Sequence, residues 1–515
     1  MLVKTYGSAV YGVEAITITI EVNVTNNGKI EALIVGLPDN AVKESLQRVE
    51  SAIKSNDFFM PRTRLVVNMA PADIRKTGSA FDLPIAIGTL AASDQLPNPE
   101  KLAEYIIMGE LSLDGLVRPI KGALPIAIQA RKEKFKGLIV PKQNAREAAM
   151  VNNLNVYGVE HLNELVQFFN DESSLAPVVV NTREEFSYAQ SDFDIDFLDV
   201  KGQENIKRAL EIAAAGGHNA ILIGPPGAGK TMLAKRLPTI LPPLNLFEAL
   251  ETTKIHSVAG KLPENATLIS KRPYRSPHHT ISDVALVGGG GNPQPGEISL
   301  AHNGVLFLDE LPEFKRTVLE VMRQPMEERR VTISRAKLAI DFPASFMLVA
   351  SMNPCPCGYF NHPQRECTCP PGAVQKYLNK ISGPLLDRID LHVEVTPVDF
   401  GELSSIKVGE PSATIRERVV KAREIQADRY KGCEGVYANA QMSSKQLKEI
   451  CVISKPGQNL LRIAMEKLNL SARAYDRILK VSRTIADLAG SADIKPEYLA
   501  EAIQYRSLDR EGWGG

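Results

Sequence analysis

The alternation of apolar and polar residues near the start of the chain predicts a β-strand with one buried face. Isoleucine or valine occupies every second position from Ile16 to Val24, and polar residues fill the positions between them. A period of two residues places all of these apolar side chains on one face of a strand. Asn26-Asn27-Gly28 is typical of a hairpin turn, so we expect residues 30–35 to form the returning strand.

A helical pattern follows, with Asp39 as its candidate N-cap. Four aliphatic side chains share one helical face: Val42, Leu46, Val49 and Ile53. Together with the strand-like run 137–141, these elements predict an α/β or α+β domain over residues 1–170, without an evident catalytic set. The polar and acidic residues 171–195 indicate a linker.

The rest of the chain divides into a second mixed segment and a helical one. Residues 196–400 contain three short apolar runs, which predict buried strands: 219–223, 305–308 and 347–352. Residues 401–515 show helical periodicity, with Ser471 as an N-cap, Gly490 as a stop and one apolar stripe between them. The stripe consists of Ile478, Val481, Ile485 and Leu488.

Composition places the chain among ordinary globular proteins. Of its 515 residues, 44% are hydrophobic and 23% charged, and 60 basic residues balance 60 acidic ones. Zero net charge neither indicates nor excludes a nucleic-acid partner, because a local basic patch suffices. The N-terminus lacks an apolar signal segment, and no apolar run approaches the ~18 residues that span a bilayer. We therefore expect a cytoplasmic protein outside the membrane.

A phosphate-binding sequence follows the first apolar run of the second segment. The motif G-x-x-x-x-G-K-[ST] is formed by Gly224, Pro225, Pro226, Gly227, Ala228, Gly229, Lys230 and Thr231. Such a loop turns backbone N–H groups toward phosphates, Lys230 reaches the β- and γ-phosphates, and the Thr231 hydroxyl binds Mg²⁺. The strand before it and the helix after it are the context that the motif requires, which argues against a chance match.

Polar residues end the other two apolar runs. In a nucleoside triphosphatase, Asp309 would help to hold Mg²⁺ and Glu310 would polarise the attacking water. Acids at a strand end are also common without such a role. Asn353 could orient the water or contact the γ-phosphate, although an asparagine before proline is more often a turn residue. Arg388 and Arg473 are candidates for stabilising phosphoryl transfer, with surface charge as the alternative.

Four cysteines form a cluster with the spacing C-x-C-x₉-C-x-C: Cys355, Cys357, Cys367 and Cys369. Four thiolates from two short loops can close a tetrahedral Zn²⁺ site, with His362 as an alternative ligand. The competing interpretation is a reduced cysteine loop without metal. Cys433 and Cys451 are expected at ordinary helix or core positions.

The order of these motifs resembles the AAA+ ATPases, and its details resemble the YifB/ComM family of magnesium-chelatase-like proteins. The likeness covers essentially the whole chain and is carried by short sequences: Gly217-His-Asn-Ala220, Pro277-His-His-Thr280, Gly288-Gly-Gly-Gly291, Pro295-Gly-Glu-Ile298 and Leu308-Asp-Glu-Leu-Pro312. It implies a three-layer α/β/α ATPase domain over 196–400 and a C-terminal helical lid. It also implies that Asn353 is sensor 1, Arg388 an arginine finger acting on a neighbouring subunit and Arg473 the sensor 2 arginine, within a hexameric ring.

The N-terminal segment resembles a Lon-protease-like α/β domain, through the sequence 109–120. Lon-type proteolysis needs a Ser–Lys dyad. Residues 119–124 lack a lysine at the position that the Lon pattern requires, and Ser79 stands in an altered context. We therefore expect no peptidase activity, and a docking or DNA-contacting role instead.

Residues 329–340 predict two strands with a basic tip at Arg335 and Lys337. The segment is similar to the pre-sensor hairpin of minichromosome-maintenance helicases, which implies a contact with the DNA backbone. A solvated hairpin is the alternative. The basic segment 271–275 and the pair His278-His279 could line a pore or form a polar loop. The basic hairpin favours an ATP- and Mg²⁺-dependent ring that moves on DNA. The resemblance to the YifB/ComM family implies branch migration or helicase activity in recombination during natural transformation. The alternatives are a protein-remodelling ATPase and a nucleotide-gated scaffold.

Overall fold

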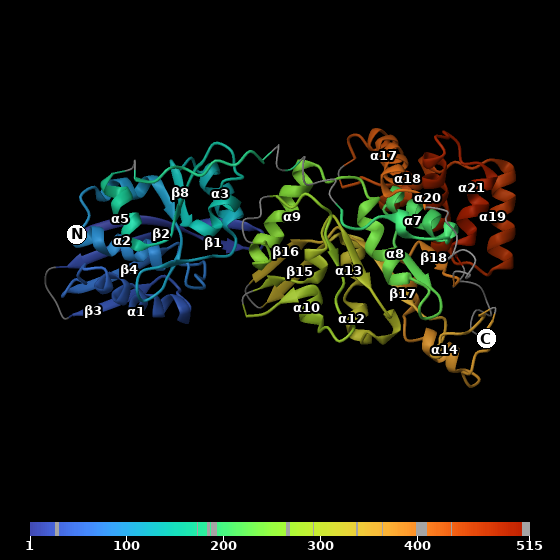
Figure 1. Ribbon diagram of the computed structural model, residues 1–515, viewed down its shortest axis with the longest axis horizontal. Coiled ribbons are helices and arrows are strands. Elements are labelled where there is room, and N and C mark those ends of the chain that lie inside the picture. The colour runs from blue at the N-terminus through green and yellow to red at the C-terminus, as the bar shows by residue number, and fades with distance from the viewer. Residues whose placement is uncertain are drawn as a thin grey trace.

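Two β-sheets and a group of helices follow one another along the long axis of the molecule (Figure 1). The structure is a computed structural model. It describes residues 1–25, 30–171, 174–182, 186, 193–263, 268–291, 293–335, 338–362, 364–397, 409–433 and 435–506.

The first sheet has seven strands in the order β3-β4-β2-β1-β5-β8-β9. Its strands are β1 (Leu2–Tyr11), β2 (Glu14–Thr25), β3 (Glu31–Val35), β4 (Arg64–Ala70), β5 (Tyr105–Ile107), β8 (Gly137–Pro141) and β9 (Asn155–Val159), and a separate pair joins β6 (Glu110–Leu111) to β7 (Val117–Arg118). The accompanying helices are α1 (Asn40–Ser55), α2 (Asp82–Ala92), the 3₁₀ helix η1 (Pro99–Glu104), α3 (Ala123–Lys132), α4 (Lys142–Ala148) and α5 (Leu162–Asn170). Helices α2 and α3 pack on β2 and bury its apolar face.

The sequence predicted the local elements of this sheet correctly but one pairing wrongly. Strand β2 and helix α1 form as expected, and Asp39 caps α1 by accepting a hydrogen bond from the Val42 amide at 2.8 Å. Strand β3 also forms, but it pairs in parallel with β4 and not with β2. Strand β2 lies between β1 and β4, so its two edges are already occupied. The expected turn at residues 26–28 lies outside the described residues.

The second sheet is parallel and has the order β11-β14-β17-β10-β18. Its strands are β11 (Tyr274–Arg275), β14 (Val305–Leu308), β17 (Met347–Met352), β10 (Ala220–Ile223) and β18 (Leu391–Glu394). The central strands are buried on both faces, which is why their sequences are apolar without alternation. Leu222, Phe307 and Val349 enter one hydrophobic core, whereas Ile221, Leu306 and Leu348 enter the other.

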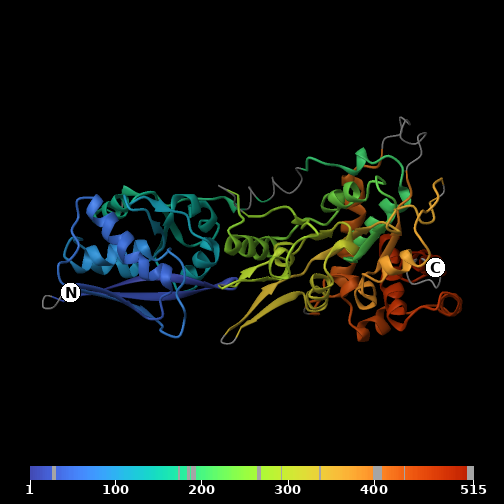
Figure 2. The same cartoon turned by 90° about the horizontal axis from the view of Figure 1, so that it is seen from below.

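Short helices and two strand pairs surround this sheet. The helices are α7 (Glu204–Gly216), α8 (Lys230–Arg236), α9 (Leu246–Ala259), α10 (Asp283–Val287), α11 (Glu297–Leu300), α12 (Arg316–Glu320), α13 (Arg323–Glu328), α14 (Ala373–Leu378) and α15 (Gly383–Leu386), with 3₁₀ turns η3 (Phe197–Asp199), η4 (Leu237–Thr239) and η5 (Leu311–Glu313). The pairs are β12 (Gly288–Gly289) with β13 (Gln294–Pro295), and β15 (Arg330–Arg335) with β16 (Leu338–Pro343). The β15–β16 hairpin, in yellow, projects from the body (Figure 2).

The last described part of the chain is helical. It contains α17 (Ser412–Arg429), the 3₁₀ turn η6 (Asn439–Gln441), α18 (Ser444–Ile450), α19 (Lys455–Lys467), α20 (Ala472–Leu488) and α21 (Pro496–Gln504). Ser471 caps α20 by accepting from the Ala474 amide at 3.2 Å, and the predicted stripe faces the core through Ile478 and Ile485. Helices α17 and α20 pack on α7, so these helices share a core with one face of the second sheet. In the described part of the chain, no helix is long and apolar enough to cross a membrane.

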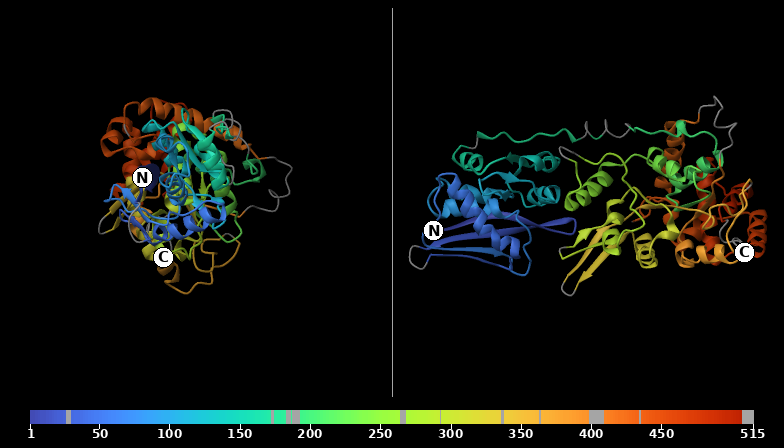
Figure 3. Two further views of the ribbon diagram at one scale, coloured as in Figure 1. Left: turned by 90° about the vertical axis from the view of Figure 1, so that its left-hand side faces the viewer. Right: turned by 60° about the horizontal axis from the view of Figure 1, so that its bottom comes forward.

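Helix α9 connects the two sheets by packing against α3 (Figure 3). Ser257 of α9 donates a hydrogen bond to the buried carboxylate of Glu147, and the Gly122 amide donates to the Ser257 carbonyl at 3.1 Å. Lys254 lies 3.2 Å from Glu14 in an ion pair. The N-terminal sheet is therefore held on the second sheet by a specific polar contact.

Candidate nucleotide-binding site

Three neighbouring parallel strands end at one edge of the second sheet, which is the edge where α/β sheets bind ligands. The glycine-rich loop follows β10, Asp309 and Glu310 follow β14, and Asn353 follows β17. Thr231 Oγ1 donates to Asp309 Oδ2 at 2.7 Å, and Lys230 Nζ donates to Asn353 Oδ1 at 3.1 Å. The fold thus brings together residues that are up to 123 positions apart in the sequence.

The loop after β10 depends on its glycines. Gly227 and Gly229 have φ values of +78° and +82°, in the left-handed region that glycine adopts without strain. A Cβ atom at Gly224 would lie 2.3 Å from the carbonyl oxygen of Val395, which no side chain could tolerate. The glycines therefore permit both the loop conformation and its close approach to the end of the neighbouring strand.

Lys230 is buried at the base of this loop. Its ammonium donates to the carbonyl oxygens of Gly224 and Pro225 at 2.6 and 2.9 Å, in addition to Asn353. Burial lowers the pKa of Lys230, and the opposing charges of Asp309 and Glu310 offset only part of this effect. The ammonium is thus surrounded by oxygen acceptors, and phosphate oxygens are acceptors of the same kind.

The carboxylate of Asp309 is fixed by hydrogen bonds at both oxygens. Oδ2 accepts from Thr231, and Oδ1 accepts from the Ser351 hydroxyl and from the Glu310 amide. A carboxylate beside a hydroxyl offers the hard oxygen ligands that Mg²⁺ prefers. Sequence reasoning missed Ser351, although a serine inside the apolar run 347–352 was a signal that could have revealed it.

Glu310 has an uncommon backbone conformation, with φ at 54°. Non-glycine residues in the left-handed region often mark functional sites, because the surrounding structure must hold them there. Its side chain is 56% exposed, and Oε2 lies 3.7 Å from His279 Nδ1. His279 contacts the rings of His278 and Phe314. The histidine pair is therefore next to the predicted water-polarising carboxylate, a placement that the sequence did not predict.

Two cavities meet at Glu310 and Asn353. The first, of about 430 Å³, is lined by the phosphate loop together with Met232, Asp309, Glu310, Ser351, Met352 and Asn353. The second, also about 430 Å³, is lined by Glu310, Glu313, Asn353, Pro356, Ala373, Lys376, Tyr377 and Lys380. Lys376 brings positive charge to the second cavity, whereas Lys380 pairs there with Glu313 at 3.1 Å; no motif in the sequence pointed to either lysine.

The two predicted arginines lie outside the residues that line these cavities. Arg388 is only 14% exposed, donates to the Pro384 carbonyl at 2.6 Å and forms an ion pair with Glu327. Arg473 is 66% exposed and pairs with Asp387 at 2.8 Å. The structure therefore brings the two arginines to one loop, at residues 387–388, rather than to the phosphate loop of the same chain.

Comparisons with known proteins agree with this geometry. Residues 196–403 match the family model "Magnesium chelatase, subunit ChlI", residues 20–144 match "Subunit ChlI of Mg-chelatase", and residues 409–506 match "Magnesium chelatase, subunit ChlI C-terminal". Competence protein ComM of Haemophilus influenzae is 46% identical over 507 residues, which cover 98% of this chain and 97% of that protein. The chain belongs to the YifB/ComM family of magnesium-chelatase-like proteins.

Two further relatives extend this assignment. The YifB protein of Escherichia coli is 44% identical over 510 residues, which cover 98% of this chain and 96% of that protein. Lon protease 2 of Bacillus subtilis is 32% identical over 154 residues, which cover 27% of this chain and 26% of that protein. Ser79 is the serine that was considered above for a Ser–Lys dyad, and its hydroxyl donates a hydrogen bond to Glu110. Lys76, three residues before it, donates instead to the carbonyl oxygens of Gly36 and Pro71.

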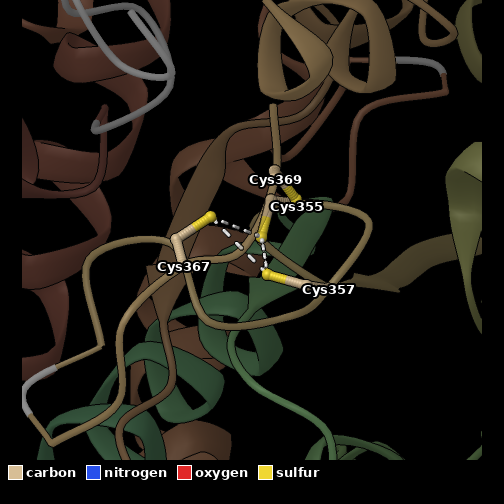
Figure 4. Close-up of side chains that lie close together, drawn as sticks. All are labelled: Cys355, Cys357, Cys367 and Cys369. Carbon is tan, nitrogen blue, oxygen red and sulfur yellow. Dashed lines mark hydrogen bonds between the residues drawn. The ribbon is translucent and has the colours of Figure 1, made fainter. Parts of the chain in front are cut away.

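The four clustered cysteines converge in space (Figure 4). Their sulfur atoms all lie within 4.8 Å of one another. His362, the alternative ligand, is not in this group, and its Nδ1 accepts from the amides of Gln364 and Arg365 at 3.1 Å. The residue types and their convergence fit a metal ion with soft ligands.

The predicted hairpin at residues 329–340 forms as β15 and β16, with Arg335 opposite Leu338 at the end of the ladder. Lys337 and the side chain of Arg335 lie outside the described residues. The basic segment 271–275 is engaged within the chain. Arg272 donates to the Pro242 and Asn303 carbonyls at 2.6 and 2.7 Å, and Arg275 forms a two-bond ion pair with Glu297.

Proposed function

We propose that the chain is a cytoplasmic, Mg²⁺-dependent AAA+ ATPase that assembles into a ring, of six subunits by family likeness, and moves on DNA. The observation that carries the ATPase is the meeting of the phosphate loop, two acids and an asparagine at one edge of a parallel sheet. We assign an N-terminal domain to residues 1–170, a linker to 171–195, the ATPase domain to 196–400 and the helical lid to 401–515.

Each residue of the site has a distinct role in this proposal. The phosphate loop and Lys230 bind the β- and γ-phosphates, while Thr231 and Asp309 hold Mg²⁺, which neutralises charge on the phosphates. Glu310 polarises the attacking water, because it lines both cavities and its side chain is largely exposed to them. Asn353 orients the water or the γ-phosphate through its amide.

A ring is supported by the position of Arg388. The residue lies outside the lining of its own chain's cavities, as a finger that completes a neighbouring site must. Arg473 is exposed and forms an ion pair with Asp387 of the same loop. In this proposal, movement of the helical lid, which carries Arg473, changes its distance from the nucleotide site. Subunits joined head to tail by such a contact form a closed ring when the rotation from one subunit to the next adds up to a full turn.

Movement on DNA is supported by the projecting β15–β16 hairpin and by the relative that is named as a competence protein. We propose that Arg335 and Lys337 contact the phosphate backbone, and that the motor carries out branch migration or unwinding during recombination of incoming DNA. The alternative is a protein-remodelling ATPase, which the match to a magnesium-chelatase subunit supports.

Two variants test the hydrolysis site. Lys230→Ala should weaken binding of a fluorescent ATP analogue, because the γ-phosphate loses its cation. Glu310→Gln should bind the analogue normally and hydrolyse ATP about 10²- to 10⁴-fold more slowly, since the amide cannot polarise water. Hydrolysis at the normal rate by Glu310→Gln would show that another group activates the water.

Subunit mixing tests the ring. Arg388→Ala and Glu310→Gln should each be inactive alone. A one-to-one mixture should recover about a quarter of the wild-type rate, because only an Arg388→Ala subunit beside a Glu310→Gln neighbour has both groups at one site. A mixture as inactive as its components would contradict an arginine that acts across the subunit interface.

A strand-displacement assay on forked and four-way DNA tests the substrate. Arg335→Ala should slow displacement and lower the salt dependence of DNA binding, because one phosphate contact is lost. Lys445→Ala, which removes an exposed lysine of helix α18, serves as the control with the same charge change. Equal displacement by both variants would remove the role of Arg335. ATPase activity that is indifferent to DNA but stimulated by a protein would favour the remodelling alternative.

A further inference from the structure

We propose that Cys355, Cys357, Cys367 and Cys369 hold one Zn²⁺ ion, and that this ion fixes one wall of the nucleotide site. The first half of the proposal rests on the cysteine cluster alone. The second half rests on the proposed ATPase, because it concerns how well the site binds and hydrolyses ATP.

The distances between the sulfur atoms match a tetrahedral thiolate site. Cys355 Sγ lies 3.3 Å from Cys357 Sγ and 3.7 Å from Cys367 Sγ, and the latter two are 3.5 Å apart. A Zn–S bond of about 2.3 Å in a tetrahedron separates the sulfurs by roughly 3.8 Å. A disulfide would bring two of them to about 2.05 Å. Three of the sulfurs therefore have close to the spacing of ligands around one ion, and the sulfur of Cys369 lies within 4.8 Å of all three.

The local backbone supports thiolate ligands. Cys355 is buried, and its sulfur accepts a hydrogen bond from the Phe360 amide at 3.3 Å. Such N–H groups orient a metal-bound thiolate and stabilise its charge. Four thiolates so close together would repel one another strongly without a cation between them. Soft thiolate ligands in a closed tetrahedron select Zn²⁺ over Mg²⁺.

The first cysteine pair lies directly against the phosphate loop. Cys355 is two residues after Asn353, so the ligand and the sensor share one short segment at the end of β17. A Cβ atom at Gly358 would lie 2.6 Å from Cδ of Pro226, so the backbone after the first pair packs on the loop itself. Any shift of this segment must therefore move the wall of the nucleotide site.

The second cysteine pair leads into helix α14 on the other side of the site. This helix begins four residues after Cys369 and carries Lys376 and Tyr377, which line the second cavity together with Asn353. An ion bound by both pairs would close the segment 355–369 into a loop whose two ends are anchored at the site. Metal binding of this kind contributes directly to local stability.

Zinc analysis of the intact chain, purified without added metal, tests the site. We expect about one zinc ion per chain in the wild type, in Cys433→Ser and in Lys230→Ala, and none in Cys355→Ser. Cys433 is exposed and outside the cluster, so it is the matched thiol control. Replacing the metal with Co²⁺ should produce the intense visible bands of tetrahedral cobalt–thiolate coordination. If Cys355→Ser does not fold, the wild-type metal content, the cobalt spectrum and Cys369→Ser decide the question.

The coupling is tested on wild-type chain after removal of zinc with a chelator, and again after zinc is restored. Removal should lower kcat/KM for ATP at least about tenfold and abolish the thermal stabilisation by Mg²⁺ and ATP, while the helical circular dichroism is retained. Added Zn²⁺ should restore both, whereas Mg²⁺ alone should not.

The outcomes separate the parts of the proposal. A chain without zinc and without cobalt–thiolate bands would overturn the metal site, and iron in place of zinc would overturn the identity of the ion. Zinc that can be removed with no change in ATP hydrolysis or stabilisation would overturn the coupling. A zinc-loaded chain that neither binds nor hydrolyses ATP would refute the proposed ATPase, and the coupling with it, while the metal site would stand.

Discussion

The carboxylate of Asp390 is a direct test of how the C-terminal helices are held on the ATPase sheet. Asp390 is 1% exposed and precedes β18. Its Oδ1 lies 3.0 Å from Arg477 of α20, and its Oδ2 accepts from the Asn219 amide at 3.1 Å and contacts His218 Nδ1 at 3.3 Å. Asp390→Asn keeps the size and the acceptor for Asn219 but removes the charge that faces Arg477.

The cost of this change follows from the burial of the pair. Removing one partner of a fully buried ion pair costs about 3–5 kcal/mol, because the other charge stays buried. The side chain of Arg477 is 24% exposed, so water can solvate part of its charge. We therefore expect the free energy of unfolding to fall by about 2–3 kcal/mol. For a folding unit of roughly 300 residues, with an unfolding entropy of about 2.1 cal/mol/K per residue, that corresponds to a decrease in Tm of about 3–5 °C.

The effect should depend on pH in a defined direction. Burial alone would raise the pKa of Asp390. Arg477, His218 and Lys480 together lower this pKa by more than burial raises it, so the net shift is downward from the ordinary value of 3.8. The folded state thus binds the proton less tightly than the unfolded state. The stabilisation is fully present above the ordinary value of 3.8, and it is lost progressively as the pH falls below 3.8 toward the lower pKa of the folded state.

Melting curves followed by near-ultraviolet circular dichroism provide the measurement. The difference in Tm between wild type and Asp390→Asn should be largest near neutral pH and should narrow as the pH falls below about 4. Asp493→Asn changes an exposed aspartate of the same helical part and should leave Tm unchanged at each pH. A Tm for Asp390→Asn within a degree or so of the wild type at pH 7 would refute the assignment of this ion pair as a structural link.

Three further variants test other contacts. Burial raises the pKa of Glu147 at its contact with Ser257, so the folded state becomes less stable as the pH rises and the carboxyl group ionises. Glu147→Gln should therefore raise Tm at pH 8 and not at pH 5. Equal effects on Tm at both pH values would refute this direction of the pH dependence. Glu327→Gln should release Arg388 from its ion pair, so that Arg388 is available to a neighbouring subunit. ATPase activity at low protein concentration should then rise about two- to fivefold. Unchanged activity would show that the ion pair does not compete with assembly. Gly358 has φ at +86°, and a Cβ atom there would clash with Pro226 of the phosphate loop, so Gly358→Ala should raise KM for ATP. An unchanged KM would show that the cysteine loop does not influence the phosphate loop.

Local patterns predicted local structure well in this chain. The alternation in β2 and the apolar stripe and cap of α20 depend on neighbours within a few positions, so the sequence contains all the information they need. The phosphate loop is predictable for the same reason, since its spacing and its glycines are contiguous. The pairing of β3 was not predictable, because its partner β4 begins 29 positions after β3 ends and the other edge of β2 was taken.

The site was predicted only as far as its motifs extend. Ser351 and Lys376 belong to no contiguous motif, and His279 belongs to one whose sequence did not indicate its contact with Glu310; all three reach the nucleotide site through the order of the strands and the loops between them. Conversely, the basic residues 272 and 275 looked available in the sequence but are bound within the fold. Charge in a sequence shows what a side chain can bind, whereas only the tertiary partners show whether it is free to do so.

In the proposed ring, the contacts around Arg388 would connect subunit assembly, the nucleotide and the helical lid through one loop. Arg473 and Arg477 of α20 form ion pairs with the acids one residue before and two residues after it, so that helix contacts the chain on both sides of Arg388. Within the described part of the chain, Arg388 Nε is buried without a hydrogen-bond partner, which costs about 1–3 kcal/mol. Arg388 also forms an ion pair with Glu327, but the Glu327 side chain is 59% exposed, and ion pairs with exposed side chains are weak. In the proposed ring, phosphate oxygens of a neighbouring site would be stronger acceptors for the same guanidinium. Assembly would then relieve a cost that the separate subunit carries, and the helical lid would be placed to govern when that happens.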